Sequence, residues 1–136
     1  MIVLTSDLKT GVAEIDQQHE ELFKRINAVH QIYSSFELKE EIENTLKFLG
    51  SYIKQHFESE EELQRKYKYP QHEWHKTMHG WYIAEFNKLN DEYKANGVSV
   101  EFSELLNHSV TNWIVKHISQ VDKNLGNFIN QQRKSF

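Results

Sequence analysis

Five histidines and two carboxylates in this sequence could together bind metal ions: His19, His56, Glu60, His75, His79, His117 and Asp122. His56 with Glu60, and His75 with His79, are pairs with four-residue spacing. Residues four apart lie about 40° apart around a helix, so both members of a pair can face one ion. Imidazole suits iron, zinc, copper and nickel, and a carboxylate can bridge two ions. The pattern therefore indicates a metal site.

The alternative interpretation is that these residues are chance pairs on solvated helix faces, or ordinary core histidines. Against it, both pairs continue lines of apolar residues: Leu49 and Ile53 precede His56, and Tyr82 follows His79. A buried polar group without a partner costs a few kcal/mol. Seven such groups at inward positions are better explained by a shared ligand.

Asp122 fits this pattern least well. It follows His117 by five residues, about 140° around an ideal helix, so spacing alone does not pair the two. A neighbouring apolar line through Ile118 and Leu125 nevertheless places Asp122 inward. The residues alone leave its role open.

Seven ligands are too many for one first-row ion, and they fit two ions that share both carboxylates, with three histidines on one ion and two on the other. Ferritin-type sites use four Glu and two Glu-x-x-His pairs, a set that is absent here. The segment His72-Glu73-Trp74-His75 also lacks the His-Glu-x-x-His spacing of zinc proteases. We interpret His30, His72 and His108 as surface or bundle-end residues, and Glu58, Glu61 and Glu62 as a solvated helix face.

Four amphipathic helices are expected to position these residues. One proline and five glycines in 136 residues favour long helices with short connections. We predict helices at about 17–35, 38–67, 72–95 and 101–131, preceded by a non-helical arm at 1–15. Asp16 is the expected N-cap of the first helix and Ser34-Ser35 its end. The predicted fold is an all-α, antiparallel up-down-up-down four-helix bundle that forms a single domain over 1–136.

Composition excludes several other classes of function. The chain has no cysteine, which rules out disulfides, iron–sulfur clusters and thiolate catalysis. A formal charge of −4 gives no reason to expect nucleic acid as a partner. No apolar run reaches the roughly 20 residues of a membrane span, and no secretory signal is recognisable, so we expect a cytoplasmic protein with no membrane association.

The ordered set of motifs resembles the bacterial hemerythrin family. The segments that carry the resemblance are Gly11-Val-Ala-Glu-Ile-Asp-Gln-Gln-His19, His56-Phe-Glu-Ser-Glu-Glu61, Tyr69-Pro70 before His75 and His79, and Trp113-Ile-Val-Lys-His117 before Asp122. They span essentially the whole chain.

The resemblance implies a non-haem diiron centre. His75, His79 and His117 would hold one iron and His19 and His56 the other, with Glu60, Asp122 and an oxo or hydroxo group bridging the two. The second iron then keeps an open position, at which the family binds O₂. An apolar O₂ pocket is implied at Leu22, Phe57, Trp113, Ile114 and Ile118. The family usually has a tryptophan where this chain has Leu4, which could leave the pocket more open.

The expected function is reversible O₂ binding for carriage, storage or delivery, without enzymatic turnover. One alternative is an O₂ or redox sensor that acts through an unidentified protein partner. A second is a diiron enzyme that reduces O₂, peroxide or nitric oxide. No additional general acid or base is evident among the inward residues, which weighs against the enzyme.

Overall fold

The computed structural model describes residues 1–32 and 39–134, and the regular elements within those ranges are all helical. A short 3₁₀ turn, η1 (Ser6–Leu8), precedes three long helices, which are α1 (Ala13–Gln31), α2 (Lys39–Lys66) and α3 (His72–Asn96). A fourth helical run is continuous from Val100 to Lys134. It consists of α4 (Val100–Glu104), η3 (Leu105–Asn112), α5 (Trp113–His117), η4 (Ile118–Asp122) and α6 (Lys123–Lys134).

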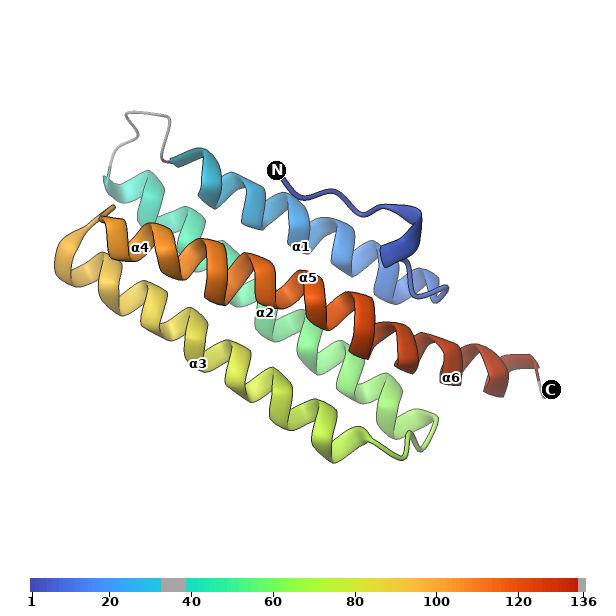
Figure 1. Ribbon diagram of the computed structural model, residues 1–136. Helices are drawn as coiled ribbons and strands as arrows, with labels where there is room; N and C mark the ends of the chain where they lie inside the picture. The colour runs from blue at the N-terminus through green and yellow to red at the C-terminus, as the bar shows by residue number, and fades with distance from the viewer. Residues whose placement is uncertain (33–38, 135–136) are drawn as a thin grey trace.

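These helical runs alternate in direction along the bundle (Figure 1). Helix α1 packs on α2, α2 on α3, and α3 on the fourth run through η3 and α4. The predicted all-α, up-down-up-down four-helix bundle is confirmed. Each helix turns one apolar line toward a shared core, as for Leu22 on α1, Ile53 on α2 and Phe86 on α3.

Helix α1 begins earlier than we predicted. It starts at Ala13, so Asp16 lies inside its first turn and is not the N-cap. The Asp16 carboxylate instead accepts hydrogen bonds from the preceding arm: from the Thr10 backbone N–H (2.7 Å), the Thr10 hydroxyl (2.8 Å) and the Gly11 N–H (3.2 Å). Gly11 has φ +83°, which lets the arm turn back over the helix start. The predicted helix end at Ser34-Ser35 lies outside the described residues.

The N-terminal arm (residues 1–12) lies alongside α1 (Figure 1). It contains the turn η1, although the sequence suggested no helical structure there. Ile2 exchanges two hydrogen bonds with the Asn27 side chain on α1, at 2.9 and 2.8 Å. Near its other end, the arm passes so close to α6 that only a glycine fits at Gly126: an added Cβ would lie 2.3 Å from the Thr10 carbonyl oxygen. The arm is therefore packed into the bundle, and η1 contacts η4.

Local signals explain the other helix boundaries. After α2, Lys68 adopts φ 54° and Pro70 follows, and both end helical geometry. Helix α3 ends at Asn96, where Gly97 follows with φ 69°. The Ser99 hydroxyl then caps α4 by accepting a 3.1 Å hydrogen bond from the Phe102 N–H.

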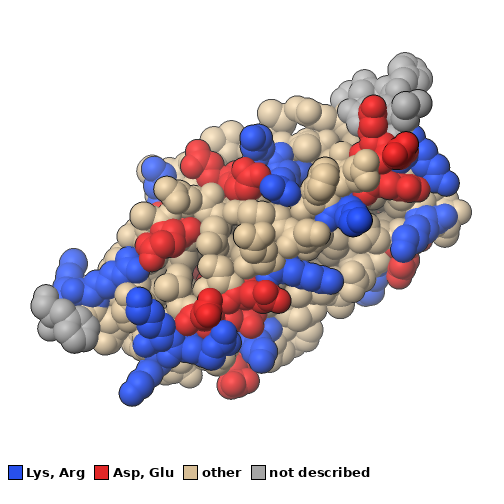
Figure 2. All heavy atoms as spheres, turned by 180° about the vertical axis from the view of Figure 1, so that it is seen from behind, with Lys and Arg blue, Asp and Glu red and all other residues tan. Residues whose placement is uncertain are grey.

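The surface carries both signs of charge. On the face opposite to that of Figure 1, basic and acidic side chains are interspersed, with no broad field of one sign (Figure 2). This face therefore lacks the continuous basic surface that nucleic acid binding uses. Within the described ranges, none of the helices combines the length and apolar character that a membrane span requires.

Candidate metal centre

The structure brings all seven candidate ligands into one buried cluster between the helical runs. Each is 3% exposed or less. His19 comes from α1 and His117 from α5, whereas the spaced pairs come from α2 and α3. Every helical run therefore contributes to the cluster, and each histidine directs Nε2 toward a carboxylate.

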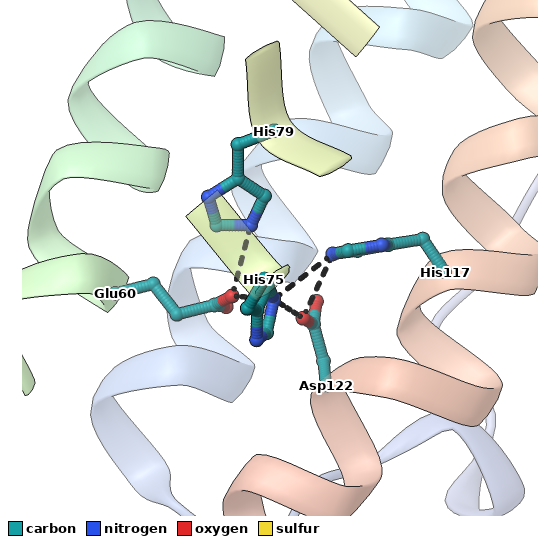
Figure 3. Close-up of side chains that lie close together, drawn as sticks. All are labelled: Glu60, His75, His79, His117 and Asp122. Carbon is teal, nitrogen blue, oxygen red and sulfur yellow. Dashed lines mark hydrogen bonds and ion pairs between the residues drawn. The ribbon is translucent and has the colours of Figure 1, made fainter. Parts of the chain in front are cut away.

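Three histidines and one oxygen from each carboxylate form the larger group (Figure 3). Glu60 Oε1 lies 2.9 Å from His75 Nε2 and 3.2 Å from His79 Nε2. Asp122 Oδ1 lies 3.0 Å from His75 Nε2 and 3.1 Å from His117 Nε2. One ion among these atoms would have five protein ligands.

The other oxygen of each carboxylate faces the two remaining histidines. Asp122 Oδ2 lies 3.0 Å from His19 Nε2, and Glu60 Oε2 lies 3.4 Å from His56 Nε2. Glu60 Oε2 is also 3.8 Å from His19 Nε2. The carboxylates thus divide their oxygens between two ligand groups, as bridging carboxylates do, and the second group has one protein ligand fewer.

A π-helical segment explains how Asp122 joins His117. Segment η4 runs from Ile118 to Asp122, where the backbone hydrogen bonds span five residues instead of four. This wider winding brings residue i+5 closer to residue i around the helix axis, so the five-residue spacing that is poor on an α-helix becomes suitable. Such π segments often occur at functional sites. No residue pattern in this segment predicts the local change of winding.

The histidines and carboxylates of the cluster shift one another's pKa values. Burial alone would lower the pKa of His19 and of His75, but the nearby Asp122 and Glu60 carboxylates outweigh burial and raise each pKa to about 9. Burial dominates at His56 and lowers its pKa to about 4. Burial also acts to raise the pKa of each carboxyl group, but the surrounding histidines hold both pKa values well below the ordinary range. Without metal the carboxylates stay anionic, so incoming cations would displace histidine protons.

The cluster is better suited to binding cations than to forming hydrogen bonds among its own side chains. Several of its buried polar atoms lack a hydrogen-bond partner, including both oxygens of Glu60 and of Asp122 and the Nε2 atoms of His19, His56 and His79. In the described part of the chain, the only such atom outside the seven side chains is Gln64 Nε2. Unsatisfied buried acceptors that converge from every helical run are the donor set expected of a metal site.

Two residues that sequence reasoning missed contact the outer nitrogens of the histidines. Glu61 Oε2 lies 2.8 Å from His79 Nδ1, and Gln18 Oε1 lies 2.7 Å from His56 Nδ1. We had placed Glu61 on a solvated face, but its side chain is only 14% exposed. An acidic run beside Glu60 looks like an ordinary polar face, so the sequence could not separate Glu61 from its neighbours.

The predicted pocket residues are apolar core residues or stack on ligand histidines. Leu22, Ile114 and Ile118 are fully buried in the main core. The Phe57 ring stacks on that of His79 with centroids 3.8 Å apart, and the Trp113 ring stacks on that of His117 at 4.8 Å. Leu4, on the arm, is partly buried against the same core.

The remaining histidines differ from one another. His108 is exposed, as expected. His30 and His72 are half-buried, which is more than we predicted. Each makes a 2.8 Å contact from a ring nitrogen: His30 with Thr111 Oγ1 and His72 with Gln64 Oε1. Both therefore have structural roles that the surface interpretation did not anticipate.

Comparison with known proteins agrees with this geometry. Residues 10–129 match the Hemerythrin HHE cation binding domain. The chain is 29% identical to bacteriohemerythrin of Methylococcus capsulatus over 89% of this chain and 90% of that protein, and 25% identical to that of Aquifex aeolicus over 84% and 86%. A crystal structure of wild-type hemerythrin superposes with a TM-score of 0.79 and 27% identity, covering 95% of this chain and 97% of the other. This chain therefore belongs to the hemerythrin HHE cation-binding domain family.

Proposed function

We propose that this protein binds O₂ reversibly at a non-haem diiron centre held by the seven clustered side chains. The observation that carries the proposal is the unequal division of ligands. Glu60 and Asp122 face both groups, but one group adds three histidines and the other only two. An ion with fewer protein ligands keeps a position for an exogenous molecule.

The surroundings favour binding over turnover. When bound, the two irons supply the electrons and the open position that O₂ requires. Phe57 and Trp113 stack on ligand imidazoles, and Leu22, Ile114 and Ile118, the other residues of the proposed apolar pocket, are fully buried. Such surroundings exclude water and anions that would compete for the open position. The protein's part is to hold the ligands, keep the site dry and admit a small apolar molecule.

Optical titration with O₂ tests this proposal. The reduced, iron-loaded protein should gain a visible absorption band on exposure to O₂ and lose it when O₂ is removed under vacuum or argon. Glu60→Gln replaces a bridging carboxylate by a neutral amide and should abolish the reversible band. Glu58→Gln, an exposed position on the same helix, should leave the band unchanged. A wild-type protein that is bleached irreversibly, or that consumes O₂ continuously with added reductant, would contradict reversible binding.

A sensor is the second candidate, because the arm contacts the segment that carries a bridging ligand. Turn η1 packs against η4, which ends at Asp122. A change in ligation at Asp122 could therefore alter the packing of residues 1–12. Hydrogen exchange of the arm with and without O₂ distinguishes the candidates: equal exchange supports a carrier, and O₂-dependent exchange supports a sensor.

A further inference from the structure

The two ligand groups differ in the charge of their outer hydrogen-bond partners. In the three-histidine group, His79 Nδ1 faces the Glu61 carboxylate at 2.8 Å. In the two-histidine group, His56 Nδ1 faces the neutral Gln18 amide oxygen at 2.7 Å. A carboxylate or an amide oxygen can only accept, so each Nδ1 carries the proton and each Nε2 lone pair points inward.

Both contacts are built into the fold. Glu61 directly follows the bridging Glu60 on α2, and its side chain is 14% exposed, so solvent screens its charge only weakly. The Phe57 ring lies parallel to that of His79, within 1°, at a centroid distance of 3.8 Å, which fixes the imidazole plane. Gln18 is held in turn by a 2.9 Å hydrogen bond from its amide N–H to Ser59 Oγ. Gln18 is therefore held from two sides, and the largely buried Glu61 faces an imidazole of fixed orientation.

The charge difference has an electronic consequence. An anionic acceptor on Nδ1–H increases the electron density at Nε2, and the imidazole becomes a stronger ligand. A neutral amide oxygen orients the ring equally well but adds less electron density at Nε2. The ion in the three-histidine group should therefore be bound more tightly than the ion that retains the open position. It should also have the lower reduction potential.

We propose that Glu61 is a positioning residue that strengthens His79 as a ligand, and that the neutral Gln18 occupies the equivalent place at His56. The two metal ions therefore differ in the affinity with which they are bound and in reduction potential. This inference rests on the proposed diiron function, but it concerns the outer partners and not O₂. The five-ligand position fills first, and the position that stays open to O₂ fills second.

Charge-swapped variants and a redox-inactive metal test the inference. Metal-free wild type, Glu61→Gln and Gln18→Glu are titrated with Zn²⁺ in the presence of a competing chelator. The reduction potentials of the iron-loaded proteins are measured by spectroelectrochemistry. Glu62→Gln is the matched control, because it removes the same charge one residue away at an exposed position. Circular dichroism verifies that each variant is folded.

Glu61→Gln should weaken the tighter Zn²⁺ step about 10- to 100-fold and raise the potential. Glu62→Gln should change neither quantity, and Gln18→Glu should strengthen the weaker step and lower the potential. Equal effects of Glu61→Gln and Glu62→Gln, or affinities and potentials unchanged in Glu61→Gln, would overturn the inference. The Zn²⁺ steps do not involve O₂, so a protein that binds Zn²⁺ as described but forms no O₂ adduct refutes only the proposed function.

Discussion

Replacing Gly126 with alanine should displace the N-terminal arm and destabilise the bundle. An added Cβ would lie 2.3 Å from the Thr10 carbonyl oxygen and 2.7 Å from the Thr10 Cβ, so the arm backbone would have to move. Gly80 provides the matched control, because it is an exposed glycine inside α3 whose added Cβ would meet nothing within 4 Å. The same chemical change is therefore expected to have opposite effects at the two positions.

The magnitudes follow from three contributions. Gly→Ala inside a helix stabilises by about 0.8–1 kcal/mol, and this is the whole effect expected for Gly80→Ala. At Gly126, overpacking costs about 1–3 kcal/mol. Moving Thr10 also weakens its two hydrogen bonds to Asp16, each of which contributes about 1 kcal/mol. The net expectation for Gly126→Ala, with both hydrogen bonds lost, is a loss of about 2–4 kcal/mol.

Urea denaturation of the two variants, at matched metal content, measures these changes. Hydrogen exchange locates them: the Thr10 and Gly11 amides donate to Asp16, so both should exchange faster in Gly126→Ala and at the wild-type rate in Gly80→Ala. If Gly126→Ala were as stabilising as Gly80→Ala, or if the two amides kept their protection, the packing of the arm on α6 described here would be wrong.

Four further results are expected. Removing the metals with a chelator should lower the stability to urea, by about 2.7 kcal/mol for each ion held at a free concentration 100 times its Kd; an unchanged unfolding midpoint would argue against a metal linked to folding. Gln18→Ala removes the hydrogen-bond partner of His56 and should weaken metal binding about 10- to 100-fold in chelator competition. Burial and the N-terminal ammonium lower the pKa of His30 below 6.5, so this residue contributes stability above pH 6.5 that is lost as the pH falls through its folded-state pKa. His30→Gln should reduce that dependence in urea titrations at several pH values. Leu4→Trp should slow the decay of the oxygenated protein, measured by optical spectroscopy, and equal decay would show that Leu4 does not matter.

The residues predicted the fold because its signals are periodic and local. Lines of apolar side chains at three- and four-residue steps mark the inward faces, and Pro70 and Gly97 mark where helices stop. Asp16 was misplaced because an acidic residue near a helix start resembles an N-cap. In the structure its carboxylate binds the arm, through contacts that depend on the turn at Gly11.

Within the site, spacing alone predicted only the two i, i+4 pairs, His56 with Glu60 and His75 with His79. The position of Asp122 depends on the π-helical winding of η4, which no residue type in that segment signals. Glu61 could not be recognised either, because its contact with His79 arises from the packing of α2 against α3. Sequence patterns therefore indicated the inward ligands, whereas the local winding and the outer hydrogen bonds required the structure.

The stoichiometry of iron and O₂ tests the central claim most directly. Protein from iron-replete cells is reduced anaerobically, its iron is quantified, and the O₂ taken up and then released under argon is measured together with the optical spectrum. Two unequal ligand groups predict two irons per chain, one O₂ for each pair of irons and full recovery of the O₂ on deoxygenation. Iron-free protein, or O₂ that is consumed and cannot be recovered, would contradict the account.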